Sequence, residues 1–516
     1  MHERGSQRLN EEQRQAVAAV VCGAGRAFPY ALFGPPGTGN TVTLVECALQ
    51  LLQAHPRARL LLCAPQNYSA DLLCSALAVA GLGTEELLRL NDPRRPAYQA
   101  KEEVLPFSLY SEQARMFTLP DRDAPLTRSL LREHLPARHA RFTHVLIDEA
   151  GQALLPKALI ALSLLELSTP GAAAAHDAGW GAVLAGDPRQ LGPVVRSQVA
   201  AGAGLATSLL DICITRHSAT AYAVMDMGRV PPTVMLLRNN HSHRRLLDLP
   251  SRLFYSGSLV PAADQQAVLP PRWDELEGEG GAQGQAAQQQ QRPGVEEAAA
   301  EAAGPEGAAE AAAAAAAEAE VDSVPAQMRE GDSPSWFNPV EASTVVELVA
   351  GLLAAAPGVG QNDIGVMATY RKQVQKIRLL LRQRGLGAIR VGAVDDYQGK
   401  EERIIFISTV LSRPESLPPL RASGATPTSD SHLGFWRSPK RFNVAVTRAK
   451  ALLVVVGQPA VLLEDASWRE LLRHCFAHGA FRGAGSASVR QRFRVDAGAA
   501  AGALPDVAEA GAGEAE

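Results

Sequence analysis

The sequence has few cysteines and no long apolar run, and each of these shortages excludes a class of protein. Its six cysteines form no CxxC pair, and no histidine stands at zinc-finger spacing, so neither a zinc module nor a disulfide framework is indicated. We expect the cysteines to be reduced core residues. No apolar run approaches the roughly 18 residues that a membrane span needs. We therefore expect an intracellular, soluble protein without a membrane partner.

The length of 516 residues exceeds what one hydrophobic core normally serves, so two or more globular domains are expected. The segment Asp274–Asp332 differs from the rest, since it consists of a glutamine run followed by a stretch of Ala, Glu, Gly and Pro. Such a composition has nothing to bury, which predicts a solvated insert. A disordered acidic tail is expected over 495–516.

Charge is unevenly distributed along the chain. The insert holds 14 acidic and 2 basic residues, and the tail holds five acidic residues and no base. Because the whole chain has a net charge of -4, the remainder has a net charge of +13. A basic folded body fits binding to a phosphate backbone, although ordinary solubility explains the same excess.

Short apolar runs alternate with longer helical patterns, as they do in βαβ units. The strands expected on this basis are Tyr30–Phe33, Arg59–Ala64, His144–Ile147, Ala182–Ala185, Ile364–Ala368, Ile389–Val394, Arg403–Val410 and Ala451–Val456. They predict an α/β protein with two parallel sheets, in domains over 1–215 and 235–475. Ligands of such sheets bind at the carboxyl ends of the strands.

One such carboxyl end carries a glycine-rich loop. Gly34–Thr41 reads GPPGTGNT between an apolar strand and a helix, which is the context of a phosphate-binding P-loop. Glycines let backbone N–H groups surround phosphates, and the Thr41 hydroxyl can bind Mg²⁺. The pattern requires lysine where this chain has Asn40. An amide offers only neutral hydrogen bonds, so nucleotide affinity and transition-state stabilisation should both fall.

A second strand, His144–Ile147, ends in the carboxylates of Asp148 and Glu149. Because a P-loop precedes this strand in the sequence, the arrangement predicts that Asp148 holds Mg²⁺ and that Glu149 acts as the base for an attacking water.

Three later motifs carry a specific resemblance. Leu184–Pro193 reads LAGDPRQLGP, Val394–Glu401 reads VDDYQGKE, and Pro439–Lys450 reads PKRFNVAVTRAK. Together they resemble motifs III, V and VI of superfamily 1 RNA helicases. Asp332–Pro339 and Tyr370–Lys376 narrow the resemblance to the superfamily 1B branch of Armitage and Moloney-leukaemia-virus-ten, near the nonsense-mediated-decay helicase. It extends from Leu9 to about Cys475 and excludes the insert.

The resemblance implies two tandem RecA-like P-loop domains that use ATP and Mg²⁺ to move 5′ to 3′ along single-stranded RNA. The residues it implies at ATP are Gln13, Gly34, Pro35, Gly37, Thr38, Gly39, Asn40, Thr41, Gly399 and Glu401. Gln13 resembles the glutamine that reads adenine, and Glu401 resembles the ribose contact. The implied catalytic residues are Asp148, Glu149, Gln190 as the γ-phosphate sensor, and Arg448 as the arginine finger. Pro65, Asn67, Ser69 and Thr409 are implied at the nucleic-acid backbone.

The chain departs from the family pattern at more than Asn40. The family places Tyr at position 240 and Arg at 241, where this chain has Asn240 and His241. His241 replaces the arginine only in part, because it carries a charge only when protonated. Losing one arginine finger costs on the order of 10³ in rate, so two lost cations should nearly silence turnover.

Three explanations of these departures stay open: a degenerate helicase that still binds RNA, a slow enzyme, and an erroneous gene model. The expected function is an ATP-dependent RNA helicase in RNA silencing or mRNA turnover, located in the cytoplasm or in RNA granules, with silencing or decay proteins as partners. The alternatives are an RNA-binding scaffold without turnover and a DNA helicase, since backbone contacts do not reveal the sugar.

Overall fold

Two compact units make up the chain. The computed structural model describes residues 9–22, 29–91, 95–108, 142–165, 181–216, 232–265, 268, 327–329, 335–416 and 438–483. Unit 1 comprises Met1–Leu269, Val394–Arg403 and Pro419–Leu452, and unit 2 comprises Pro270–Ala393, Ile404–Pro418 and Leu453–Glu516. The segments that carry motifs V and VI thus belong largely to unit 1. The domain boundaries expected from the sequence remain a prediction.

Unit 1 is built on a five-stranded sheet in which every neighbouring pair is parallel. Its strands, in spatial order, are β2 (Leu60–Cys63), β3 (His144–Ile147), β4 (Gly181–Gly186), β1 (Tyr30–Phe33) and β5 (Thr233–Met235). The first four were expected from the sequence. β5 was missed, because three residues are too few to show a strand periodicity.

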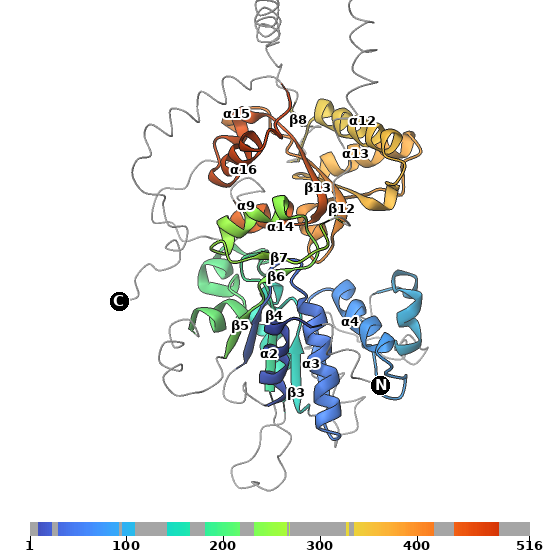
Figure 1. Cartoon of the computed structure of the whole chain (residues 1–516), viewed down its shortest axis with the longest axis vertical. Helices are drawn as coiled ribbons and strands as arrows, with labels where there is room; N and C mark the ends of the chain where they lie inside the picture. Colours follow the sequence, from blue (N-terminus) through green and yellow to red (C-terminus); the bar gives the residue numbers. More distant parts are fainter. Residues whose placement is uncertain are drawn as a thin grey trace, which may run out of the picture. The chain divides into compact units, whose positions relative to one another are not determined.

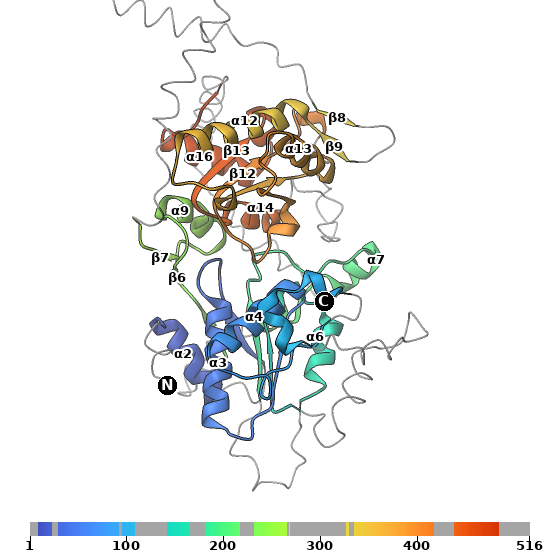
Figure 2. The ribbon, with the colours of Figure 1, turned by 90° about the vertical axis from the view of Figure 1, so that its right-hand side faces the viewer.

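Helices cover both faces of this sheet, since alternate side chains of each strand point to opposite faces. The described helices are α2 (Glu11–Val21), α3 (Asn40–Ala54), α4 (Asn67–Val79), α6 (Leu155–Leu162), α7 (Gln198–Ala200), α9 (Arg244–Phe254) and α14 (Pro439–Val446). Shorter helical turns are η1 (Ala97–Gln99), η2 (Glu102–Phe107), η4 (Ala150–Gln152), η5 (Ala201–Leu205) and η7 (Val394–Tyr397). Figure 2 shows α3 on one side of the strands and α6 on the other. The parallel sheet is therefore buried on both faces, as expected for an α/β fold.

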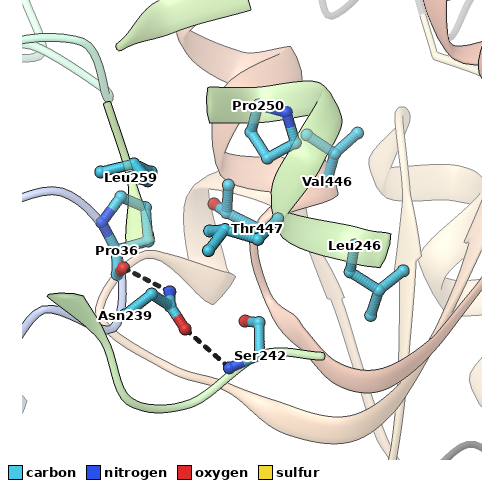
Figure 3. Close-up of a pocket in the computed structure, with 9 residues that line it drawn as sticks. Pro36, Asn239, Ser242, Leu246, Pro250, Leu259, Val446 and Thr447 are labelled. Atoms are coloured by element: carbon cyan, nitrogen blue, oxygen red, sulfur yellow. Dashed lines mark hydrogen bonds between the residues drawn. The ribbon is translucent and has the colours of Figure 1, made fainter. Parts of the chain in front are cut away.

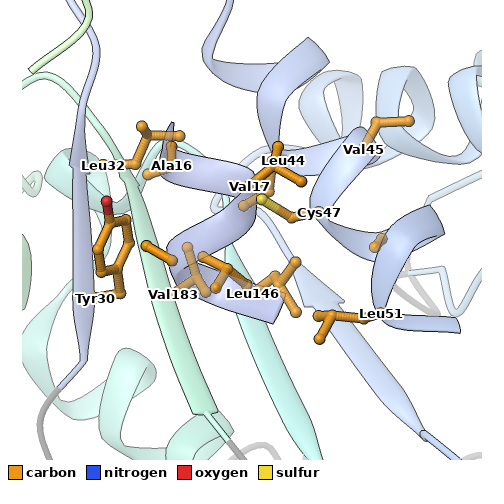
Figure 4. Packing of buried hydrophobic residues seen from close by; sticks show 14 of the residues in the cluster. Ala16, Val17, Tyr30, Leu32, Leu44, Val45, Cys47, Leu51, Leu146 and Val183 are labelled. Carbon is orange, nitrogen blue, oxygen red and sulfur yellow. The ribbon is translucent and has the colours of Figure 1, made fainter. Parts of the chain in front are cut away.

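The core under α2 and α3 is aliphatic and closely packed. Leu32 of β1 and Leu146 of β3 point into it, together with Leu44 and Leu51 of α3 (Figure 4). Their neighbours Ala31 and Val145, one residue away along the strands, belong to the core on the opposite face. Replacing one of these leucines by alanine typically costs about 2–5 kcal/mol.

Unit 2 contains a four-stranded sheet. Its strands, in spatial order, are β11 (Arg390–Ala393), β10 (Ile364–Ala368), β12 (Glu402–Ser408) and β13 (Ala449–Val456). The helices are α12 (Pro339–Ala355), α13 (Arg371–Gln383), α15 (Pro459–Leu462) and α16 (Ala466–Ala477), with the turns η6 (Gln361–Asp363) and η8 (Pro414–Ser416). Figure 1 shows α12 and α13 on one side of β12 and β13, and α15 and α16 on the other. The first residues of β12 and β13 group with unit 1.

The chain also contains two minor sheets, β6 (Arg238–Asn239) with β7 (Val260–Pro261) and β8 (Met328–Arg329) with β9 (Trp336–Phe337). The β8 strand falls inside the segment expected to be an unstructured insert, so that expectation is wrong for Met328 and Arg329. Apart from residues 327–329, the expected insert lies outside the described residues, as does the tail over 495–516.

One expectation about apolar runs needs correction. Gln198–Arg216 is 19 residues long, and an 18-residue window within it has a mean hydropathy of 1.4, which meets the length and composition of a membrane span. A single stretch of this kind is weak evidence. Its backbone is not one continuous helix, because Gly204 has a φ of 91° and a new helix begins only at residue 209.

The expectation that all cysteines are core residues holds only in part. Cys47, Cys74 and Cys213 are buried and Cys63 and Cys475 are half-buried, but Cys22 is exposed. All six are free thiols, so the prediction is wrong only for Cys22, which ends α2 at the surface.

Candidate nucleotide-binding site

The predicted P-loop connects β1 to α3 and needs its glycines for steric reasons. Gly37 and Gly39 have φ angles of 69° and 89°, in the left-handed region that L side chains avoid. A Cβ on Gly37 would lie 2.5 Å from the Asn239 side chain. Because α3 begins directly after Gly39, the backbone N–H groups of its first turn end at the loop, which is a favourable place for an anion.

Gln13 lies against this loop. Its Nε2 donates to the Thr38 carbonyl at 3.0 Å, and its Oε1 accepts from the Asn10 backbone N–H in the capping box of α2. Thr38 is fully buried, and its hydroxyl donates to the Pro35 carbonyl at 2.7 Å. The structure thus brings Gln13 to the P-loop, while its role in reading adenine stays a prediction.

Asn40 is bonded to the loop itself. Its Nδ2 donates to the Gly34 carbonyl at 2.6 Å, which joins the two ends of the loop. A Cβ on Gly34 would lie 1.4 Å from Asn40 Oδ1. The Asn40 amide therefore occupies the space that a side chain at position 34 would need. Its buried Oδ1 has no hydrogen-bond partner among the described residues, which costs roughly 1–3 kcal/mol. The loop therefore receives no positive charge from this position.

Thr41 and Asp148 form the part of the site that fits Mg²⁺. The Thr41 hydroxyl donates to Asp148 Oδ2 at 2.9 Å, so both oxygens face the same space. Burial, and then the neighbouring Glu149 carboxylate, raise the pKa of Asp148 to about 7, despite the hydrogen bond from Thr41. A divalent cation would offset this excess of buried negative charge, and hydroxyl and carboxylate oxygens are the ligands that Mg²⁺ prefers.

Two glutamine side chains, hydrogen-bonded one to the next, hold the carboxylate of Glu149. Its φ of 50° lies in the left-handed region, where non-glycine residues are strained and often functional. Gln152 Nε2 donates to Glu149 Oε2 at 2.8 Å, and Gln66 Nε2 donates to Gln152 Oε1 at 2.8 Å. Burial raises the pKa of Glu149, whereas the bond from Gln152 and the charge of Arg448 oppose that rise. Sequence reasoning gave Gln66 and Gln152 no role.

Gln190 and Arg448, the expected sensor and arginine finger, are in direct contact. Arg448 Nη2 donates to Gln190 Oε1 at 3.3 Å, and both side chains are buried. Gln190 follows β4, and Arg448 stands between α14 and β13. Both residues belong to unit 1. Two motifs that lie 258 positions apart in the sequence thus meet at one hydrogen bond.

This contact continues into a buried network that sequence reasoning missed. Gln190 Nε2 donates to Asp187 Oδ2 at 2.9 Å, and the Tyr255 hydroxyl donates to the same oxygen at 2.6 Å. Asn443 Nδ2 in turn donates to the Tyr255 hydroxyl at 2.7 Å. Burial raises the pKa of Asp187 to about 6, although these hydrogen bonds and the charge of Arg448 oppose it. The sequence places Asp187 and Asn443 inside the expected motifs III and VI, but nothing in it indicates that Tyr255 joins them.

Motif V brings Gly399 and Glu401 to the same site. A Cβ on Gly399, whose φ is 69°, would lie 3.6 Å from Glu149 Oε1 and 4.0 Å from Ser69 Oγ. Glu401 is hydrogen-bonded to His241 Nδ1. Burial raises the pKa of Glu401, but the bond and charge of His241, followed by Arg448 and Lys450, outweigh it, so the net shift is downward. The residue expected to bind ribose is thus engaged by the histidine that replaces the family's arginine.

Asn239 holds the segment before α9 against the P-loop. Its Nδ2 donates to the Pro36 carbonyl at 2.8 Å, and its Oδ1 accepts from the backbone N–H of Ser242 at 2.8 Å (Figure 3). The same oxygen accepts from the backbone N–H of His241 at 3.0 Å. Pro36, Asn239 and Ser242 line a small pocket that is otherwise mostly apolar. The remaining lining residues are Leu246, Leu247, Pro250, Leu259, Val446 and Thr447. Asn239 therefore fixes where His241 stands relative to the loop.

The residues expected at the nucleic-acid backbone differ in how far they are exposed. Pro65 and Asn67 are exposed at the start of α4, whereas Ser69 is buried. Thr409 lies in unit 2, is fully buried, and donates its hydroxyl to the Val456 carbonyl at 3.2 Å. Pro65, Asn67 and Ser69 thus belong to one short segment of unit 1, and Thr409 belongs to unit 2. Their nucleic-acid contacts stay a prediction.

Comparison with known proteins agrees with this set of motifs. Two family profiles, each described as an AAA domain, match residues 8–118 and 127–198, and residues 220–460. The chain is 35% identical over 503 residues to MOV-10 of Gallus gallus, named as a helicase, covering 92% of this chain and 47% of that protein. It is 36% identical over 492 residues to RNA helicase Mov10l1 of Homo sapiens, covering 92% of this chain and 35% of that protein.

The chain thus spans between a third and a half of the length of these relatives. Among solved structures, an arterivirus nonstructural protein 10 helicase is similar with 14% identity and a TM-score of 0.35, covering 87% of this chain and 62% of that chain. A score this low carries no argument about function. The α/β fold and the two AAA domains, by contrast, agree with the tandem RecA-like architecture expected from the motifs.

Proposed function

This chain belongs to the family of helicases that includes MOV-10 and Mov10l1, and from that premise we propose that it is an ATP-dependent RNA helicase. The proposed substrate is single-stranded RNA, along which the protein moves in the 5′-to-3′ direction.

Two contacts within unit 1 support the proposal most directly. Thr41 and Asp148 join the P-loop to the carboxylate strand, and Gln190 and Arg448 join motif III to motif VI. Glu149 links the two pairs, because it follows Asp148 in the chain and the charge of Arg448 opposes the rise that burial gives to its pKa. A nucleoside triphosphate that lies on the P-loop needs this combination of a metal ligand, a base, a sensor and a cation.

When bound, Mg²⁺ neutralises phosphate charge and ATP supplies the phosphoanhydride bond that is hydrolysed. Thr41 and Asp148 would hold the ion through their oxygens. Glu149 in its ionised form can accept the proton of an attacking water, and Gln152 keeps its carboxylate in one orientation. Arg448 offers a buried guanidinium for charge that develops on the transferred phosphoryl group.

A second candidate, an RNA-binding scaffold without turnover, is favoured by Asn40. Its amide is bonded to Gly34 and brings no charge to the loop. One charge-assisted hydrogen bond is worth roughly 1.5–3 kcal/mol, so nucleotide binding should be weakened about tenfold to hundredfold.

Phosphate release with and without oligouridylate, measured for the unchanged chain and for Asn40→Lys, separates the two candidates. RNA-stimulated release by the unchanged chain would support the helicase and remove the scaffold. Release only by Asn40→Lys would support the scaffold on a helicase framework, and Asn40→Gln serves as the matched neutral control. Stimulation by oligodeoxythymidylate alone would favour a DNA helicase instead.

We also propose a cytoplasmic setting, including RNA granules, in RNA silencing or mRNA turnover with silencing or decay proteins as partners. The support for this setting is the family membership alone. Fluorescence microscopy of the tagged chain tests it, and a purely nuclear or membrane signal would contradict it.

A further inference from the structure

Two glutamine side chains connect the segment expected at nucleic acid with the expected catalytic base. Gln66 Nε2 donates to Gln152 Oε1 at 2.8 Å, and Gln152 Nε2 donates to Glu149 Oε2 at 2.8 Å. Gln66 and Gln152, called the glutamine pair below, lie 86 positions apart in the sequence and both belong to unit 1. A change at Gln66 can therefore reach the Glu149 carboxylate through two hydrogen bonds.

The side chain of Gln66 is not used by its own helix. Gln66 is the N-cap residue of α4, but its side chain makes no capping hydrogen bond. Residues at this position usually direct a short polar side chain onto the backbone N–H groups of the first turn. The Gln66 backbone carbonyl accepts from the Ala70 N–H at 3.2 Å, so the backbone begins the helix while the side-chain amide binds Gln152.

The residues on both sides of Gln66 face solvent. Pro65 and Asn67 are exposed, whereas Gln66 between them is half-buried. A strand of nucleic acid that contacts Pro65 and Asn67 would hold the backbone on either side of Gln66. Because Gln66 would then have fewer conformations to adopt, its hydrogen bond to Gln152 would be formed for more of the time.

The Glu149 carboxylate is the group that this bond would orient. Gln152 is its hydrogen-bond donor among the described residues. A Cβ on Gly399 would lie 3.6 Å from Glu149 Oε1 and 4.0 Å from Ser69 Oγ, so the segment that carries Gln66 also approaches the second carboxylate oxygen. A general base must lie within hydrogen-bond reach of the proton that it accepts, so its orientation affects the rate.

We propose that Gln66 is a positioning residue that couples nucleic acid bound on the segment 65–69 to the orientation of Glu149, the proposed base. The ligand is the backbone of a single strand, and Gln152 transmits its effect to the carboxylate. This inference rests on the proposed function and adds to it a route by which nucleic acid accelerates ATP hydrolysis. Such coupling requires that nucleic acid favour the bonded arrangement of the glutamine pair over the others.

Hydrogen exchange of the full, unchanged chain tests the coupling in the absence of nucleotide. Oligouridylate should slow the exchange of the backbone N–H groups of Gln152 and Ala153, which are bonded within the turn that follows Asp148. The expected slowing is about fivefold, the effect of one neutral hydrogen bond on local opening. Gln66→Met keeps the length of the side chain without its donor, and should abolish this slowing while oligouridylate still binds.

Gln50→Met is the matched control. Gln50 Nε2 donates to Glu46 Oε1 at 2.8 Å within α3, so this variant loses the same kind of glutamine-to-carboxylate bond elsewhere in unit 1. The exchange response to oligouridylate should stay intact in Gln50→Met.

ATP turnover tests the consequence for the base. Phosphate release is measured at saturating ATP and oligouridylate in the unchanged chain or, if that chain releases none, in Asn40→Lys. Gln66→Met should lower kcat about fivefold, and Gln152→Met at least as much. Gln152→Met should also move the acid limb of the pH profile upward, because the bond from Gln152 opposes the rise that burial gives to the pKa of Glu149. In the Gln152→Met chain, adding Gln66→Met should cost nothing further.

Each outcome decides a different claim. If the unchanged chain does not bind oligouridylate, the proposed function fails and the inference fails with it. If oligouridylate binds but exchange at Gln152 and Ala153 does not respond, or responds equally in Gln66→Met, the inference is overturned while the function stands. Additive losses of kcat in Gln66→Met and Gln152→Met would also overturn it, since they would show two separate roles. If neither chain releases phosphate, the helicase proposal fails and the exchange response alone decides the inference.

Discussion

The candidate nucleotide site has two halves, the P-loop half around Asn40 and the sensor half around Gln190 and Arg448, and they differ in whether the expected cation is present. In the P-loop half, the position of the expected lysine is taken by Asn40, whose amide bonds to the loop's own carbonyl. In the sensor half, the expected cation is present, and the guanidinium of Arg448 lies buried within hydrogen-bonding distance of Gln190. The P-loop half therefore has no cation at position 40 and is bonded to its own backbone, whereas the sensor half has the cation of Arg448 in a hydrogen-bond network.

This difference explains why the residues of the sensor half can be present in a chain whose ATP turnover is expected to be weak. Hydrogen bonds join the side chains of Asp187, Gln190 and Tyr255 and the Nδ2 of Asn443, while Asn443 Oδ1 is buried without a partner among the described residues. Each buried group left unpaired costs about 1–3 kcal/mol, so breaking these bonds would destabilise the fold. The sensor half therefore stabilises the fold whether or not ATP is hydrolysed. Gln190 and its partners thus have a structural role beside the proposed catalytic one, whereas the residue at position 40 bears on nucleotide binding alone.

The largest expected effect tests whether the sensor half still acts in catalysis. In the Asn40→Lys chain, Arg448→Ala should lower the turnover of ATP by on the order of 10³ or more, because the transition-state cation is removed. Steady-state phosphate release measures it, with the exposed Arg196→Ala as control. If Asn40→Lys hydrolyses ATP at the same rate with and without Arg448→Ala, then Arg448 has only a structural role, as a member of the hydrogen-bond network.

A smaller effect concerns pH and Mg²⁺. Burial raises the pKa of Asp148 from 3.8 to about 7, so the folded state holds its proton more tightly than the unfolded state does. The free energy of unfolding should then fall as pH rises from about 4 to about 7, by up to about 1.4 kcal/mol per pH unit for one such group. Mg²⁺ favours the charged carboxylate, so its stabilising effect should grow over the same range.

Urea unfolding at several pH values, with and without Mg²⁺, checks this. Asp148→Asn should lessen the pH dependence and abolish the effect of Mg²⁺. Glu341→Gln is the control in unit 2, because burial also raises the pKa of Glu341 to about 7 but its oxygens bind Ser408 and the Val410 backbone. It should lessen the pH dependence and leave the effect of Mg²⁺ intact. Equal stabilisation of Asp148→Asn and the unchanged chain by Mg²⁺ would remove Asp148 from the proposed ion site.

The smallest effect tests the structural role of the sensor half. Tyr255→Phe keeps the ring but removes the hydroxyl between Asp187 and Asn443, and should lower the free energy of unfolding by about 1 kcal/mol. The exposed Tyr98→Phe should change nothing. Combining Tyr255→Phe with Asn443→Ala should cost less than the two separate losses, because both remove the same bond. Strict additivity would speak against a shared network.

Sequence periodicity predicted the strands that matter most, since β1 and β3 are four-residue apolar runs that lead directly into the P-loop and into Asp148. Position and residue type were enough there, because the carboxyl ends of neighbouring parallel strands meet at one edge of a sheet. The same reasoning failed for β5 and for Met328 and Arg329, where two or three residues carry no detectable period.

Residue identity alone determined that the loop lacks a lysine and that two carboxylates follow β3. The tertiary structure decided the rest: that Asn40 turns back onto Gly34, that His241 engages Glu401, and that Tyr255 and Asn443 complete the network of Asp187. The physical reason is separation along the chain. Hydrogen bonds such as that between Arg448 and Gln190 join residues 258 positions apart, and only folding determines which buried donor meets which acceptor.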